Sequence, residues 1–321
     1  MADFFLSERL GETRAAVVER FHLVEMHIAR DGDGLAAGAR LPARLKAKLG
    51  QRGIAQADGE ELLVEPWPAG ATEGATVTLE VTRAAWAEHG RERLAKARPT
   101  ALAPSPSPGL AAALQARGLA RKPGWPPEVA DQWDEAFEQA KLGRFAFDSG
   151  ALQLMPTPAF LAVDVDGPGL SLALPALAAL ARLIRLWGLG GNIVVDLPAA
   201  DKAQRTAAAE AFDAGMRSLA FERTAINGFG MLQIVRPRPG PSILERAQLD
   251  RAGTEAIELL ERALADRGTA PLRLKARAPV VRWLESRPHL LEELGQRSHR
   301  AVDLAVDPLS GTGHVETSQR A

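Results

Sequence analysis

Two apolar segments that end on aspartate decide the predicted fold: Phe160-Leu161-Ala162-Val163-Asp164-Val165-Asp166-Gly167 and Gly190-Gly191-Asn192-Ile193-Val194-Val195-Asp196. Their β-branched and aliphatic residues stop at Gly or Pro, which is typical of short buried β-strands. Between them, an Ala- and Leu-rich stretch from Leu174 to Trp187 ends at Gly188, which indicates a buried helix with a glycine stop. Strand, helix and strand in so few residues predict a right-handed βαβ unit with parallel strands.

Three aspartates follow from this arrangement as candidate site residues. Parallel strands bring their carboxyl ends to the same edge of a sheet, so Asp164, Asp166 and Asp196 are expected to converge. A carboxylate at a strand end has the protein core on one side and solvent on the other. Because hard divalent cations prefer oxygen ligands, this edge is a good place to hold a metal.

The composition narrows the class of protein. A chain of 321 residues has room for two or three domains, and its net charge of −1 means that any site for a polyanion must be a local patch. The absence of cysteine excludes disulfides and cysteine-based zinc sites and fits a reducing compartment. The N-terminus lacks a basic segment followed by an apolar one, and no apolar run approaches the roughly 18 residues that span a bilayer. We therefore predict a cytoplasmic protein with no membrane partner.

The region from residue 38 to about 98 predicts a small antiparallel β-barrel. Several short strand-like stretches are separated by the turn signals Asp58-Gly59 and Glu73-Gly74. Barrels of the OB kind bind single-stranded nucleic acid with a basic strand face and aromatic platforms, but Trp67 and Trp86 are the only aromatic residues nearby. The alternative is a solvated face on which basic residues serve solubility. The candidate nucleic-acid-binding residues of the first strand are Arg40, Arg44, Lys46 and Lys48.

Beyond Asp196, a helix capped by Asp201 and a strand to Val235 predict a second βαβ-like step, which places Arg236 and Arg238 at a strand end of the same sheet. These arginines either form ion pairs with carboxylates or contact substrate phosphates. A helix from Arg246 to Asp266, with Glu255 outside, then opens a small α/β domain. The tail from Ser310 is expected to be frayed.

Four stretches in this order resemble the ribonuclease E/G family. Ser149-Gly150 leads into Ala162–Gly167, which is similar to the family's strand ending in Ile-Asp-(Ile/Val)-Asn. Residues 190–196 resemble its Gly-Gly-(apolar)-Asp strand, and residues 229–238 resemble its Gly-Leu segment ending in Arg-x-Arg. The order of strands and helices after Leu272 also agrees. The resemblance covers about residues 144–306 and extends loosely to the N-terminal hairpin and the barrel.

The resemblance implies a multidomain α/β protein with an RNase H-like/DNase I-like mixed sheet core, an inserted S1/OB-like β-barrel and a small C-terminal α/β domain. The implied ranges are an N-terminal hairpin of the RNase H-like part (1–33), the barrel (34–100), a linker with remnant RNase H-like helices (101–148), a catalytic DNase I-like domain (149–245) and the C-terminal domain (246–321).

The resemblance also implies the chemistry of a Mg²⁺-dependent endoribonuclease that cuts single-stranded RNA and leaves 5′-phosphate and 3′-hydroxyl ends. Asp164 and Asp196 match the family's two magnesium-binding aspartates. Asp166 stands where the family has asparagine, so it keeps an oxygen ligand, adds charge and loses the amide donor. Arg236 and Arg238 are expected to contact phosphate, and the basic strand is expected to follow the RNA backbone.

Three departures from the family shape these expectations. The loop between Asp166 and Leu174 is much shorter than the family's. The segment between the barrel and residue 144 is too short for both a 5′-monophosphate sensor and a whole RNase H-like domain, so we expect no sensing of the RNA 5′ end. No cysteine pair follows Arg246, so a zinc-linked dimer cannot form. Two further readings stay open: an RNA-binding protein without efficient cleavage, and a structural or regulatory partner protein whose aspartates only cap strands and pair with arginines.

Overall fold

The computed structural model describes residues 2–88, 91–168, 172–198 and 200–317. Within these ranges the chain is a mixed α/β protein with several β-sheets and a closed five-stranded β-barrel. Contacts divide it into two compact units. The first comprises Met1–Leu6, Ala15–His27 and Asp33–Leu249, and the second comprises Ser7–Arg14, Ile28–Gly32 and Asp250–Ala321. The finer division into five ranges stays a prediction.

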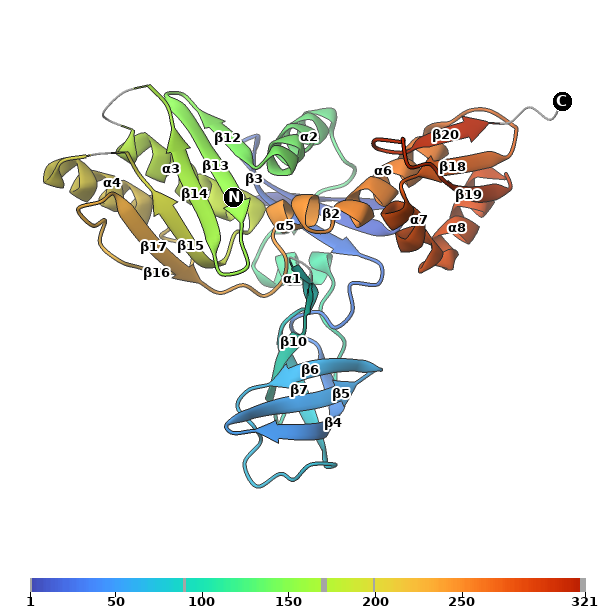
Figure 1. Ribbon diagram of the computed structural model, residues 1–321, viewed down its shortest axis with the longest axis horizontal. Helices are drawn as coiled ribbons and strands as arrows, with labels where there is room; N and C mark the ends of the chain where they lie inside the picture. The colour runs from blue at the N-terminus through green and yellow to red at the C-terminus, as the bar shows by residue number, and fades with distance from the viewer. Residues whose placement is uncertain (1, 89–90, 169–171, 199, 318–321) are drawn as a thin grey trace. The chain divides into compact units, whose positions relative to one another are not determined.

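A six-stranded sheet in the first unit contains both strands that end on aspartate (Figure 1). Strand β14 (Leu161–Asp166) lies parallel to β15 (Gly191–Asp196), and helix α3 (Ala173–Trp187) connects them. The helix ends at Gly188, which has a left-handed φ of 64°. The predicted strand–helix–strand unit with parallel strands is therefore confirmed. The sheet order is β12-β13-β14-β15-β17-β16, with β12 (Arg144–Phe147), β13 (Gly150–Pro156), β16 (Glu222–Arg223) and β17 (Met231–Arg236).

This sheet has a buried face and an open face because apolar and polar residues alternate along its strands. Val163, Ile193 and Ile234 are buried on one face. On the same side, Trp187 of α3 meets Phe145 of β12 edge to face, with ring centroids 6.0 Å apart. The residues between these positions in the strands face solvent, so the polar side chains of β14 and β15 share the open face.

The step from β15 to β17 differs from the prediction. Helix α4 (Lys202–Gly215) begins with the expected cap, in which Asp201 accepts from the backbone N–H of Gln204 at 2.8 Å. However, β17 runs antiparallel to β15, so the predicted second βαβ-like step is wrong. After α4 the chain first forms β16 and a turn at residues 227–230, and it enters β17 at the end where β15 stops.

The closed barrel has the order β10-β6-β5-β4-β7, drawn in blue and cyan in Figure 1. Its pairs are antiparallel except that β10 lies parallel to β6. Leu45, Leu62 and Leu79 are fully buried inside it, and a Cβ atom at Gly53 would collide with the ring of Trp67. The strands are β4 (Arg40–Leu49), β5 (Arg52–Ala57), β6 (Glu60–Val64), β7 (Thr76–Arg83) and β10 (Ala95–Pro99).

The N-terminal hairpin expected within residues 1–33 consists of β2 (Glu12–Glu19) and β3 (His22–Arg30), joined by Arg20 and Phe21 in left-handed conformations. It belongs to a four-stranded sheet of order β11-β1-β2-β3. Strands β1 (Asp3–Arg9) and β11 (Ala120–Arg121) were not predicted from the sequence. The remaining elements of the first unit are β8 (Trp86–Glu88), β9 (Arg91–Arg93), α1 (Leu110–Ala116), α2 (Pro127–Leu142) and α5 (Ile243–Gln248).

The second unit corrects two predictions. The helix expected from Arg246 to Asp266 is interrupted, because Asp250 caps a new helix by accepting from the N–H of Gly253 at 3.2 Å. Glu255, expected outside, is buried and pairs with Arg251 and Arg277, both at 2.7–2.8 Å. The elements are α6 (Arg251–Ala265), β18 (Leu272–Ala276), α7 (Ala278–Glu285), α8 (Pro288–Ser298), β19 (Val302–Val306) and β20 (His314–Thr317).

The second unit also orders part of the predicted frayed tail, because β20 pairs antiparallel with the central strand β18. The order of this small sheet is β19-β18-β20. Leu259, Leu274 and Leu284 are fully buried in the unit's own core. Among the helices of the described residues, none combines the length and the apolar character that crossing a bilayer requires.

Candidate metal and nucleic-acid site

Asp164 and Asp196 lie side by side in the six-stranded sheet. The register of the parallel pair makes them direct partners, on strands about 4.8 Å apart. Both side chains are exposed on the open face, whereas their strand neighbours Val163 and Val195 point into the core. The predicted convergence of these two carboxylates is therefore confirmed, and the strand register is its cause.

Asp166 lies two residues beyond Asp164 and shares its face of the sheet. One of its carboxylate oxygens accepts a hydrogen bond from the side-chain amide of Gln153 at 3.1 Å. Gln153 is the partner of Asp164 across the antiparallel pair β13–β14, so it stands next to both aspartates. No sequence pattern predicted Gln153, because the register between strands β13 and β14 brings it to this site.

The electrostatic surroundings of the two paired aspartates are unusual. Within the described ranges, neither Asp164 nor Asp196 forms a hydrogen bond or an ion pair through its side chain. Two like charges in adjacent strands repel each other, and neither arginine predicted nearby offsets them. A bound cation would remove that repulsion.

The oxygen atoms at this edge fit a magnesium ion in type and number. Mg²⁺ prefers oxygen ligands, keeps several waters and is commonly held by one or two carboxylates together with substrate phosphates. The described residues contain no group of three or more His, Cys, Asp or Glu side chains suited to a metal. Asp164 and Asp196 would therefore supply two ligands of an otherwise hydrated ion.

Arg236 lies at the opposite end of β15 from the carboxylates. Gly191 is the partner of Arg236 in the β15–β17 pair, whereas Asp196 is the partner of Met231. Five residues of strand separate these positions, which corresponds to about 16 Å. The Arg236 guanidinium donates to the backbone carbonyl of Leu189, and burial lowers the pKa of Arg236.

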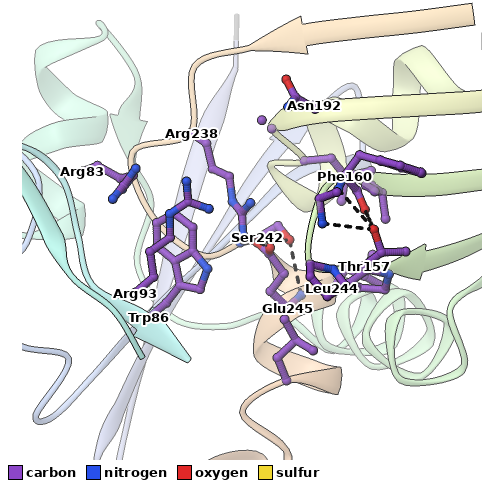
Figure 2. A pocket seen from close by; sticks show the side chains of 18 of the residues that line it. Arg83, Trp86, Arg93, Thr157, Phe160, Asn192, Arg238, Ser242, Leu244 and Glu245 are labelled. Carbon is purple, nitrogen blue, oxygen red and sulfur yellow. Dashed lines mark hydrogen bonds and ion pairs between the residues drawn. The ribbon is translucent and has the colours of Figure 1, made fainter. Parts of the chain in front are cut away.

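Arg238 lines a cavity of about 520 Å³ in the first unit. Figure 2 shows Arg83, Arg93 and Arg238 around Trp86. Their guanidinium carbons lie 5.4, 5.2 and 4.1 Å from the centroid of the Trp86 ring. Arg238 also forms an ion pair with Glu245. The ion-pair alternative of the sequence analysis is thus confirmed for Arg238, although its carboxylate partner is Glu245 and none of the three aspartates.

The basic strand of the barrel carries its charges on the outer face of β4. Arg44, Lys46 and Lys48 are exposed, and Arg40 is half-buried opposite Glu80 of β7. Trp67 and Trp86, the only aromatic residues that the sequence offers near this strand, are buried and present no open ring. The barrel therefore provides a row of positive charges without an aromatic platform from these two residues.

No family model matches the chain, and no curated protein matches its sequence.

Proposed function

We propose that the chain is a Mg²⁺-dependent endoribonuclease of the ribonuclease E/G type that cleaves single-stranded RNA and leaves 5′-phosphate and 3′-hydroxyl ends. The observation that carries the proposal is the in-register pair of exposed aspartates, Asp164 and Asp196, with no positive partner among the described residues. A carboxylate pair without a structural role in the protein is suited to a cation and, with it, to a phosphate.

The architecture supports the same assignment. The barrel has five strands in a closed, Greek-key-like order with one parallel contact, which fits an S1/OB-like domain. The mixed sheet, with one helical face and one open face, fits a DNase I-like catalytic core. The four sequence stretches that resemble the family lie in this sheet and in the second unit.

We assign a role to each of the three aspartates from its position in the sheet. Asp164 and Asp196 would hold the ion, and Asp166, oriented by Gln153, would assist from the same face. A divalent ion at such a site lowers the pKa of bound water and neutralises charge on the phosphate. Hydrolysis breaks the bond between phosphorus and the 3′ oxygen, so that oxygen leaves as a hydroxyl and the phosphate stays on the 5′ end.

The arginines fit a role away from the scissile bond. Arg236 and Arg238 lie at the far end of β15 and are held by the Leu189 carbonyl and by Glu245, so a phosphate farther along the RNA would have to compete with these partners. Arg44, Lys46 and Lys48 are exposed and fit contacts with the RNA backbone, for which each charge neutralised makes binding more salt-dependent. Arg40 belongs to the same row.

A second function, RNA binding without efficient cleavage, is favoured by the small number of metal ligands among the described residues. Cleavage of a fluorophore-labelled single-stranded RNA separates the two. We expect cutting with Mg²⁺, none with EDTA, and a loss of at least about 10³-fold in the Asp164→Asn/Asp196→Asn double variant, with RNA binding retained. Wild-type protein that binds the RNA and never cuts it would establish the second function.

A further inference from the structure

Phe229 lies at the tip of the turn that precedes β17, and it is 90% exposed. A large aromatic side chain in water forgoes the free energy that burial would provide. The turn that carries it belongs to the same sheet edge as the two paired aspartates, because Met231, two residues on, is the partner of Asp196.

Hydrogen bonds fix the backbone of this turn, although the Phe229 ring is exposed to solvent. The side-chain oxygen of Asn227 accepts from the N–H groups of Phe229 and Met231, at 2.9 and 3.0 Å. The N–H of Gly230 donates to the carbonyl of Asn227 at 3.2 Å. Gly230 has a φ of 84°, and a Cβ atom there would collide with the carbonyl of Leu197. The turn therefore presents Phe229 from a fixed position.

The same turn is attached directly to the carboxylate edge. Leu197, which follows Asp196, donates its N–H to the carbonyl of Gly230 at 3.2 Å. Two residues of chain span at most about 7 Å, so the Cα of Phe229 lies within that distance of Met231, the neighbour of Asp196. An exposed aromatic ring thus stands next to the proposed cleavage site.

We propose that Phe229 is a stacking platform for an unpaired nucleobase of the RNA held at Asp164 and Asp196. The inference rests on the proposed function and adds the substrate contact that selects single strands. Stacking on an aromatic ring uses the face of a base, which every base has and which a duplex already covers with its own neighbours. Phe229 supplies here the open ring that Trp67 and Trp86 do not supply at the barrel.

The chain offers a matched control for this proposal. Phe21 is 91% exposed and also lies in a turn between strands, the one that joins β2 to β3 in a different sheet. Removing either ring deletes the same exposed apolar area. Only the loss of Phe229 is expected to affect RNA bound at the aspartates.

The test measures binding of a fluorescein-labelled ten-residue oligouridylate by fluorescence anisotropy, in protein that keeps Asp164 and Asp196 and with Ca²⁺ in place of Mg²⁺, because Ca²⁺ also takes oxygen ligands. Gel analysis of the labelled RNA checks that it stays intact. We expect Phe229→Ala to weaken binding about tenfold, which corresponds to about 1.4 kcal/mol, Phe229→Trp to restore it, and Phe21→Ala to leave it unchanged. Equal effects of the two alanine variants, or none for either, would overturn the proposal.

A second measurement locates the base. Oligouridylates that each contain one abasic position are cleaved by wild-type protein and by Phe229→Ala. We expect one abasic position near the cut to slow wild-type cleavage and to have no further effect in Phe229→Ala.

The possible outcomes separate the two proposals. If every abasic position slows cleavage equally in both proteins, Phe229 is not a stacking platform, but the cleavage still supports the proposed nuclease function. If no RNA is cut but anisotropy still depends on Phe229, the nuclease proposal fails and the platform stands. A change of oligomeric state in Phe229→Ala, seen by light scattering, would assign the ring to a protein contact and overturn the platform.

Discussion

Glu25 and the pair Asp164 and Asp196 are carboxylates of the same compact unit with opposite surroundings. Glu25 lies on β3 and is only 5% exposed. Both of its oxygens accept from Arg117, each at 2.7 Å, and Arg185 of α3 donates to one of them at 3.1 Å. The aspartates, in contrast, are exposed and have no such partners among the described residues.

The comparison separates carboxylates that hold the fold together from carboxylates that are open to a ligand. Burying a charge is costly unless it is paired, so Glu25 is matched by two guanidinium groups. Repulsion between two exposed carboxylates on adjacent strands costs on the order of 1 kcal/mol in water. The folded protein contains this unfavourable interaction. A residue pair that opposes stability is a better candidate for function than one that supports it.

The largest effect on stability is expected for Glu25→Gln. The substitution leaves Arg117 and Arg185 without their carboxylate, and since both are partly exposed and can be hydrated, we expect a loss of about 2 kcal/mol in the free energy of unfolding. Asp196→Asn should change stability by less than about 0.5 kcal/mol, or raise it, because it removes a repulsion. Urea denaturation of the three proteins checks both, and equal losses would contradict the distinction.

The pH dependence of stability should follow Glu25 as well. Burial alone would raise the pKa of Glu25, but hydrogen bonds from His27 and Arg117 outweigh it and hold the pKa well below its usual value near 4.5. A lowered pKa in the folded state stabilises the protein above the unfolded value, and this stabilisation is lost as the pH falls below about 4.5.

Urea denaturation between pH 7 and pH 3.5 measures this contribution as the difference between wild type and Glu25→Gln. The difference should be constant above about pH 5.5 and should shrink below pH 4.5, by at most about 1.4 kcal/mol per pH unit. Taking the difference cancels the other acidic groups whose pKa values are lowered, such as Glu12 and Asp213. A difference that stays constant down to pH 3.5 would show that Glu25 does not titrate in this way.

The sequence predicted the aspartate pair because its signals are local. Apolar runs that stop at aspartate indicated the strands, and the helix between them indicated their parallel order, so Asp164 and Asp196 were expected at one edge. Asp201 was expected to cap α4 for a similar reason, since a capping residue acts within one turn of its helix. Each of these signals is read from a short stretch of chain, although the direct pairing of Asp164 with Asp196 depends on the register of β14 and β15.

The features that the sequence did not predict depend on contacts between distant segments. The direction of β17 depends on the path of the chain after α4. Because β17 was expected to run parallel to β15, Arg236 was expected at the same sheet edge as the carboxylates. Gln153 and Phe229 reach the site through strand register, which no pattern within either strand specifies. Glu255 looked like a surface residue because one of its two arginine partners, Arg277, lies 22 positions away.

The smallest expected effect is stabilisation by Mg²⁺, and it is the most direct test of the exposed pair Asp164 and Asp196, called the open pair below. A ligand that binds only the folded state stabilises it by an amount set by its concentration relative to Kd, which is about 0.8 kcal/mol at three times Kd. We expect this gain in urea denaturation of the wild type with MgCl₂, against KCl at matched ionic strength, and we expect it to vanish in Asp196→Asn.

The Glu25→Gln protein completes this Mg²⁺ test as a control. Its carboxylate is engaged by Arg117 and Arg185, so removing that carboxylate should lower stability and leave the Mg²⁺-dependent gain intact. A gain of equal size in Asp196→Asn would mean that the ion acts elsewhere, and the open pair would then have no ligand of this kind. A gain that is lost only with the aspartates would show that the two kinds of carboxylate differ in function as well as in surroundings.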